Sequence, residues 1–142
     1  MALKVTKTLV WVAEIKDQPG ALAACIDTLA EAGANLDCII ARRLSNRPGT
    51  GAVSVTPLTG RKVRATAAKA GFIATKRIAT LKVEGNNQPG VGARLARAVG
   101  AAVVNVRGSF AAVVGRKFVC YLSFDKTSEA NKAAKAIRRA GR

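Results

Sequence analysis

The sequence predicts an α+β protein built from two copies of one βαββαβ unit. Two observations predict this fold class: a set of residues recurs at a separation of 70 positions, and strand-like and helix-like segments alternate in the same order within each copy. A chain of 142 residues also leaves room for two small domains. We expect the first domain at residues 1–77 and the second at residues 78–142.

The repeat keeps one register without a gap. The tripeptide Gln18-Pro19-Gly20 recurs as Gln88-Pro89-Gly90. Three further matches at the same separation are Asn35 with Asn105, Glu14 with Glu84, and Ala70-Gly71 with Ala140-Gly141. A duplicated domain explains this set of matches better than coincidence does.

The first copy begins with a predicted strand at residues 8–14, which are rich in β-branched and aromatic side chains. A helix follows from Ala21, because its apolar residues have the spacing of a one-sided helix, and Gly33 suits its C-terminal cap. The apolar residues in question are Leu22, Cys25, Ile26 and Leu29. The remaining predicted elements are strands at 36–44 and 52–57 around a loop at 45–51, a helix at 61–70 and a strand at 72–77.

The second copy repeats this order up to its last strand. Its predicted elements are a strand at 78–84, a helix at 91–99, strands at 103–110 and 117–124, and a helix at 128–140. Such a split β-α-β pair forms an antiparallel sheet with both helices on one face, the ferredoxin-like arrangement. Because no strand follows the last helix, either the second sheet keeps a bare edge or another segment, residues 2–7, covers it.

Two features of the composition argue against catalysis. The chain has no histidine, which excludes Ser-His-Asp triads, histidine-paired cysteine nucleophiles and histidine-ligated metals. Cys25, Cys38 and Cys120 lack the Cys-x-x-Cys spacing of metal and redox sites and have apolar neighbours, which is typical of buried thiols. We therefore expect no enzyme activity, no cofactor and no metal site.

The charge is strongly positive, with 24 Lys and Arg against 8 Asp and Glu and a formal net charge of +16. Such a charge favours anionic partners, namely nucleic acid, an anionic membrane surface or an acidic protein. The basic residues are scattered without a continuous run of five, however, which favours a solvated cationic surface. No apolar run approaches the roughly 18 residues of a membrane span, so we expect a soluble cytoplasmic protein.

The repeated Gln-Pro-Gly turn lies between the end of a strand and the start of a helix. Unpaired N–H groups and the helix dipole make that position favourable for a carboxylate or a phosphate. Asn35 and Asn105 stand at the start of the next strand, and each offers a donor and an acceptor. These residues suit a ligand that is anionic at one end. Taken one copy at a time, however, they are explained better by a turn that only starts a helix.

The first copy reads Asp17-Gln18-Pro19-Gly20-Ala21-Leu22 and then, after the helix, Gly33-Ala34-Asn35-Leu36. This pattern resembles the ACT domain, a small βαββαβ module that binds amino acids and other small ligands in regulators of metabolism. The second copy matches more loosely, with Asn87-Gln88-Pro89-Gly90-Val91-Gly92 and Asn105. The resemblance covers almost the whole chain, which is similar to stand-alone tandem ACT proteins without a catalytic domain.

The resemblance implies a regulatory protein that binds an amino acid. It implies that domains pair side by side into a continuous antiparallel sheet with helices on one face. Ligands then sit at the seam, between the turn of one domain and the second strand of its partner. The implied ligand-binding residues are Asp17, Gln18, Gly20, Ala21, Leu22 and Asn35, and Asn87, Gln88, Gly90, Val91, Gly92 and Asn105.

By this resemblance, backbone N–H groups at 20–22 or 90–92 would bind the ligand carboxylate, and Asn35 or Asn105, with Asp17, would bind its ammonium group. The two sites are expected to be unequal, because Asn87 replaces Asp17 in the second copy. Gly92 replaces Leu22, which should cost about 1 kcal/mol of helix stability and one core contact. Val103 replaces Gly33, so we expect the second helix cap to be built differently.

Two other functions remain as alternatives. RNA-recognition domains share the βαββαβ plan, and Phe118-Val119-Cys120-Tyr121 matches the end of their RNP1 motif. Residues three apart on a strand face opposite sides, however, so alternating core and surface positions explain Phe118 and Tyr121 better. The chain could also be the regulatory subunit of a metabolic enzyme. We expect a homodimer, since a second chain would close the sheet edge near the C-terminus.

Overall fold

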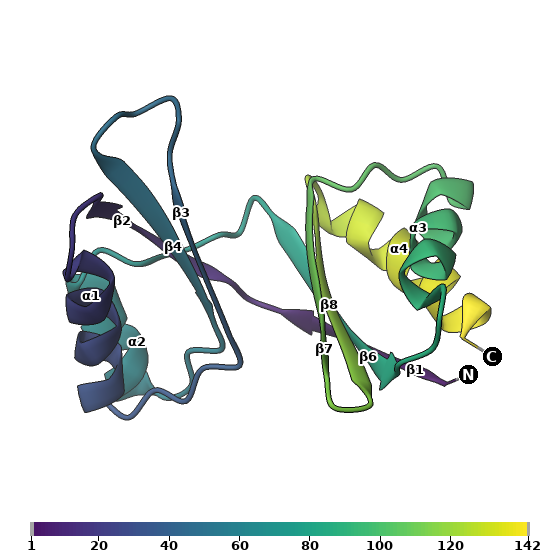
Figure 1. Ribbon diagram of the computed structural model, residues 1–142, viewed down its shortest axis with the longest axis horizontal. Coiled ribbons are helices and arrows are strands. Elements are labelled where there is room, and N and C mark those ends of the chain that lie inside the picture. The colour runs from purple at the N-terminus through teal and green to yellow at the C-terminus, as the bar shows by residue number, and fades with distance from the viewer. Residues whose placement is uncertain (1, 142) are drawn as a thin grey trace. The chain divides into compact units, whose positions relative to one another are not determined.

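A computed structural model describes residues 2–141 of the chain (Figure 1). The predicted α+β class is confirmed, and all four helices lie within two residues of their predicted bounds. The elements in order are β1 Leu3–Thr8, β2 Trp11–Lys16, α1 Ala21–Glu31, β3 Cys38–Arg43, β4 Thr50–Thr56, α2 Arg61–Lys69, β5 Ile73–Ala74, β6 Ala79–Asn86, α3 Val91–Ala101, β7 Gly108–Val114, β8 Lys117–Phe124 and α4 Thr127–Ala140.

The described chain forms two compact units, each with its own antiparallel sheet. The inserted unit, Leu9–Thr75, holds the sheet β3-β4-β2-β5. The outer unit combines β1 with the chain from Lys76 onward and holds the sheet β1-β6-β8-β7. The sequence predicted one continuous sheet, but strand pairing within the chain produces two four-stranded sheets. The predicted division after residue 77 follows the repeat in the sequence, whereas these units follow spatial contacts.

Strand β1 supplies the strand that the second copy lacks. All six of its residues pair antiparallel with β6, from Leu3 opposite Gly85 to Thr8 opposite Thr80. Two glycines make room for Leu3: a Cβ at Gly85 would lie 2.6 Å from its Cδ2, and one at Gly141 would lie 3.1 Å from its Cβ. The prediction that residues 2–7 cover the open edge is therefore confirmed, and the bare edge is excluded.

In the inserted unit the corresponding strand is short. Strand β5 has two residues where the sequence predicted a strand at 72–77, and it pairs only with Trp11 and Val12 of β2. The N–H of Thr75 donates to the carbonyl of Val10 at 2.9 Å, and the Thr75 hydroxyl donates to the same oxygen at 2.7 Å. These bonds fasten the two ends of the inserted unit to each other.

The first helix of each unit ends in the same left-handed cap. Gly33 has φ of 99°, and Val103, its counterpart, has φ of 58°. In both caps the following N–H reaches back five residues, from Ala34 to the carbonyl of Leu29 at 3.0 Å and from Val104 to that of Val99 at 3.3 Å. The prediction of a differently built second cap is wrong, because the hydrogen bonds that end a helix impose this backbone whichever residue occupies it.

The strand predicted at 103–110 lies further along the chain. Residues 103–107 form the cap and a connection, and β7 spans Gly108–Val114. The N–H of Arg107 donates to the carbonyl of Ser123 at 2.8 Å, which sets the start of the pairing with β8. The run of valines after Val103 suggested a strand because it is β-branched, but the end of the helix takes precedence over that preference.

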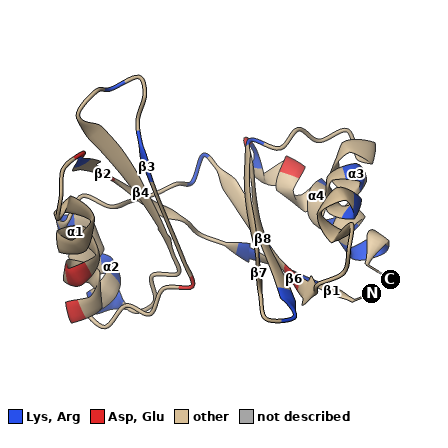
Figure 2. Ribbon diagram, viewed as in Figure 1, with Lys and Arg blue, Asp and Glu red and all other residues tan. Residues whose placement is uncertain are grey.

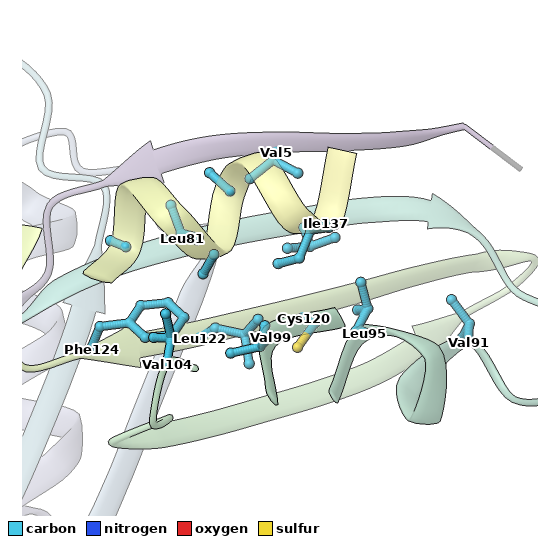
Figure 3. Close-up of a cluster of buried hydrophobic side chains, with 14 of the residues drawn as sticks. Val5, Leu81, Val91, Leu95, Val99, Val104, Cys120, Leu122, Phe124 and Ile137 are labelled. Carbon is cyan, nitrogen blue, oxygen red and sulfur yellow. The ribbon is translucent and has the colours of Figure 1, made fainter. Parts of the chain in front are cut away.

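The two hydrophobic cores differ in size. The core of the outer unit contains fifteen buried residues, including Leu95 and Val99 of α3, Phe124 of β8 and Ile137 of α4 (Figure 3). The core of the inserted unit contains eight buried residues, and α1 contributes only Leu29. The full inserted set is Ala13, Leu29, Val53, Val55, Leu58, Val63, Ala67 and Phe72.

Leu22 lies outside the core of the inserted unit. Its side chain is 41% exposed, whereas Cys25 and Ile26 pack partly against the buried cluster. The prediction that Gly92 costs a core contact relative to Leu22 is therefore wrong, because that position lies outside the core. The helix periodicity correctly predicted that Leu29 is buried, but it wrongly included Leu22 in the buried face of α1.

Candidate functional site

The repeated turn has the same backbone in both units. Gly20 has φ and ψ of 85° and −14°, and Gly90 has 84° and 3°. Both are the residue before an eleven-residue helix, and a residue with a side chain rarely adopts this conformation. The turn closes in the same way, since the N–H of Ala21 donates to Gln18 at 3.3 Å and that of Val91 donates to Gln88 at 3.1 Å.

Each helix start leaves backbone donors open. The N–H groups of Ala21 and Val91 already donate within the turn, to Gln18 and Gln88. The N–H groups of Leu22 and Gly92 have no hydrogen-bond acceptor within residues 2–141. They lie at exposed positions on the positive end of a helix dipole, so a carboxylate is the group that suits them.

The turn of the inserted unit contains an ion pair. The Arg43 Nε donates to the Asp17 Oδ2, and the backbone N–H of Asp17 donates to the carbonyl of Gly49 at 3.0 Å. Sequence reasoning missed Arg43. The strand register could have identified Arg43. Arg43 of β3 and Ile15 of β2 both lie opposite Gly51 of β4, which places Arg43 near Asp17, the residue that follows β2.

The turn of the outer unit lacks this charge pair. The backbone N–H of Asn87 donates to the carbonyl of Arg116 at 2.8 Å, the counterpart of the bond from Asp17 to Gly49. Asn87 replaces the carboxylate of Asp17, and Val113 stands where the repeat would place Arg43. In the adjoining strands the Lys117 Nζ donates to the Asn86 Oδ1 at 3.0 Å. The two candidate sites therefore differ in charge.

Within one unit the structure does not bring the turn and the asparagine together. Asn35 and Asn105 are exposed and follow the C-terminal ends of α1 and α3, whereas Gln18 and Gln88 precede the N-terminal ends. A helix of eleven residues is roughly 16 Å long, which separates the two groups by more than the length of an amino acid. A complete site would need a turn and an asparagine from different domains.

The aromatic side chains of β8 do not form a stacking surface. Phe118 is 6% exposed and belongs to the core of the outer unit, and Tyr121 is 7% exposed. A sheet that stacks bases needs aromatic rings open to solvent. The prediction that Phe118 and Tyr121 alternate between core and surface is wrong, because both side chains are buried. The RNP1-like match therefore has no exposed ring to offer.

Cys25 and Cys120 have the properties of structural thiols. Burial raises the pKa of Cys120 from 9.0 to about 11 and also raises the pKa of Cys25. A thiol must lose its proton to act as a nucleophile or metal ligand, so burial keeps both groups unreactive near neutral pH. Residues 2–141 contain no group of three His, Cys, Asp or Glu side chains that could hold a metal ion. No helix in this part of the chain has the length and apolarity needed to span a bilayer.

Comparison with solved structures identifies the fold. The ligand-free regulatory subunit of aspartate kinase from Thermus thermophilus is 21% identical, with a TM-score of 0.68 over 100% of this chain and 98% of that chain. A protein from Bacteroides thetaiotaomicron is 12% identical, with a TM-score of 0.77 over 95% and 89% of the two chains. Escherichia coli aspartokinase III, in complex with aspartate and ADP, is 14% identical, with a TM-score of 0.59 over 98% of this chain and 32% of that chain.

These matches confirm the tandem ACT-type fold over the full length of the chain. No family model matches the sequence, and no curated protein matches it.

Proposed function

We propose that the chain is a non-catalytic, cytoplasmic regulatory protein that binds an amino acid where the Gln-Pro-Gly turn of one domain meets the second strand of another. The main support is the turn itself, which has the same backbone in both units and presents open N–H donors at a helix start. The likeness to regulatory subunits of aspartate kinase supports the regulatory role.

The chemistry of the site follows from the charges of a zwitterion. The N–H of Leu22 or Gly92 binds the ligand carboxylate, since the helix dipole stabilises a negative charge there. Asn35 or Asn105 from another domain accepts a hydrogen bond from the ammonium group. In the inserted unit Asp17 adds a negative charge that can attract the ammonium group, and Asp17 also forms an ion pair with Arg43. The inserted turn is therefore the stronger of the two sites, and neither requires a metal or a cofactor.

A homodimer would supply the second domain, although for a different reason from the one that the sequence suggested. The edge near the C-terminus is closed by β1, which removes the original argument. The dimer proposal now rests on β7, an edge strand whose seven residues are uncharged and all exposed. Phe110 and Val114 are 48% and 72% exposed, and an apolar edge strand of this length is suited to pairing with another strand.

A regulatory subunit of an enzyme is the second candidate. Both separate regulatory subunits and a segment of a longer aspartokinase chain share this fold. In that role the ligand would change how the chain contacts its enzyme, and the active site would lie on the partner. Binding of the ligand to the isolated chain is common to both candidates, so it is tested first.

The first test is thermal unfolding of the intact chain with each of the twenty amino acids at millimolar concentration. A ligand that binds only the folded state stabilises it by about 2.7 kcal/mol at a hundred times its dissociation constant. Because Trp11 is the only tryptophan, its fluorescence follows the inserted unit, where the stronger site is proposed. We expect one amino acid, or a few that are alike, to raise the unfolding temperature.

A double variant, Asn35→Ala with Asn105→Ala, should abolish that stabilisation without lowering the unfolding temperature of the free protein. Asn131→Ala is the matched control, because Asn131 is an exposed asparagine on α4. An unchanged response in the double variant would place the ligand elsewhere. If no amino acid stabilises the protein, the isolated chain is not an amino-acid sensor, and the enzyme-partner candidate becomes the one to pursue.

A further inference from the structure

The positive charge is concentrated in one of the two units. The outer unit carries 16 basic and 3 acidic residues, a formal charge of +13, whereas the inserted unit carries 8 and 5, a charge of +3. Figure 2 shows basic positions along both α3 and α4. The scattered appearance of the basic residues in the sequence therefore does not persist in the fold.

Five of these residues form what we call the basic helix face. They are Arg94 and Arg97 of α3 and Lys132, Lys135 and Arg139 of α4. The two helices pack against each other on the same side of the outer sheet (Figure 1). All five side chains are exposed, because the opposite faces of the helices carry the buried residues of the core.

The charges of this face are not neutralised within the chain. None of the five cations has an ion pair or hydrogen bond with another residue of the described chain, 2–141. Arg138 provides a contrast, since its Nη2 donates to the carbonyl of Val5 at 3.1 Å. Glu129 is the one acidic residue on either helix. The face therefore attracts an anionic partner that approaches the helices from outside.

The chemistry of the face favours a nucleic acid over a protein or a membrane. Protein interfaces depend on apolar or aromatic anchors, and helices that lie on membranes insert large apolar side chains. Within the described residues no large exposed hydrophobic side chain lies on α3 or α4. A nucleic acid needs no such anchor, because binding is driven by the release of counterions from its phosphates.

The same reasoning favours a duplex over a single strand. Proteins bind single strands by stacking bases on aromatic rings, and α3 and α4 carry no aromatic residue. The cations of α4 span about 10 Å along the helix axis, from Lys132 to Arg139, which is about three times the axial spacing of ~3.4 Å between successive phosphates of one strand. We propose that the basic helix face binds the phosphate backbone of double-stranded nucleic acid without reading its sequence.

The test is fluorescence anisotropy of the intact chain with a labelled 20-base-pair DNA duplex at 50 to 200 mM KCl. Five phosphate contacts predict a slope of about −4.5 in log affinity against log salt, and hence a loss of several hundred-fold over this range. Neutralising three of them, in Lys132→Gln with Lys135→Gln and Arg139→Gln, should make the slope shallower by about 2.7. Glutamine preserves the helix preference of these exposed positions.

A matched control removes the same charge from the other unit. Arg61→Gln with Lys62→Gln and Lys69→Gln changes three exposed cations of α2, and we expect it to leave the slope near the wild-type value. If the α4 triple variant does not fold, Arg94→Gln with Arg97→Gln on α3 tests the same face and should make the slope shallower by about 1.8.

Three results would overturn the proposal. The first is no binding of the duplex at 50 mM salt. The second is an equal loss in the α4 and α2 variants, which would mean that overall charge is responsible. The third is binding to vesicles that contain phosphatidylserine without binding to the duplex, which would identify a membrane surface as the partner.

Discussion

The two units share one fold and one chain order of helices, yet they are packed differently. The outer unit buries fifteen residues in its core and completes its sheet with the six residues of β1. The inserted unit buries eight and ends its sheet with the two residues of β5. A duplicated pattern of turns and caps therefore specifies the backbone of a unit, while the stability of the unit depends on side chains that differ between the two copies.

The difference in core size should make the two units differ in their free energy of unfolding. A fully buried aliphatic or aromatic side chain contributes about 1.5 to 3 kcal/mol, so the outer unit should be the more stable of the two. The chain allows each unit to be followed separately, because Trp11 is its only tryptophan and Tyr121 its only tyrosine. Trp11 belongs to the inserted unit and Tyr121 to the outer unit. We expect Trp11 to report unfolding at a lower urea concentration than Tyr121.

The largest effect is expected from Val5→Asp, which would reverse the order of stability. Val5 is 7% exposed on β1, so an unpaired carboxylate would be buried in the outer core at a cost of about 3 kcal/mol or more. Urea unfolding followed at Tyr121 should shift strongly, while the transition at Trp11 stays in place. Lys7→Asp, at an exposed position of the same strand, is the control. Equal shifts in both signals would show that the units unfold together.

A matched pair of truncations compares the two cores directly. Leu29 and Val99 occupy equivalent positions of the repeat and are 0% and 1% exposed. Leu29→Ala should cost about 2 to 5 kcal/mol and Val99→Ala less, because fewer atoms are removed. In the smaller core we expect Leu29→Ala to abolish the cooperative Trp11 transition, whereas Val99→Ala should shift the Tyr121 transition without abolishing it. The reverse outcome would contradict the ranking of the cores.

Exchanging the cap residues Gly33 and Val103 should change the stability of the two units by smaller amounts and in opposite directions. Gly33→Val should destabilise the inserted unit by about 1 to 2 kcal/mol, since a side chain disfavours a left-handed backbone. Val103→Gly relieves the same strain in the outer unit, but its more flexible unfolded chain offsets part of the gain, leaving less than about 1 kcal/mol. Val103 is 91% exposed, so no core contact is lost. Thermal unfolding of the two variants would measure both changes.

The smallest effect is a dependence on pH in the alkaline range. Burial raises the pKa of Cys120 from 9.0 to about 11, so the folded protein keeps a proton that the unfolded chain loses. The contribution of the Cys120 thiol to the free energy of unfolding is complete below pH 9 and is lost as the pH rises from about 9 to about 11. Cys120→Ala should therefore unfold with a shallower pH dependence at Tyr121 over pH 8 to 10, by about 1 kcal/mol. Identical slopes in the two proteins would indicate a solvated thiol.

The elements that could be predicted are those set by local residues. The residue preferences of turns and helix caps at Gly20 and Gly90 correctly predicted where α1 and α3 begin. Each Gln-Pro-Gly turn is a weak motif by itself, and its recurrence made the prediction stronger. The displaced strand β7 could not be predicted, because the helix cap at Val103 overrides the β preference of the valines around it. The exposure of Leu22 also could not be predicted, since it depends on how far α1 extends over its sheet.

The candidate site was predicted only in part, for a similar reason. The turn is local and was found, whereas Arg43 reaches Asp17 across 26 positions through the register of a hairpin. The basic helix face is still less visible in the sequence, because α3 and α4 belong to separate segments and their cations gather only after the helices pack. Residues that meet through tertiary packing carry no common spacing that a linear pattern could reveal.

The bonds between Val10 and Thr75 have a consequence for how the protein is made. During synthesis β1 leaves the ribosome well before its partner β6, which appears more than seventy positions later. Closing so long a loop is entropically costly. The inserted unit is contiguous, so it can fold before β6 is complete, and its Val10–Thr75 clasp then draws the chain leading from β1 close to the chain leading into β6. A mutation that delays folding of the inserted unit should therefore lower the yield of both units.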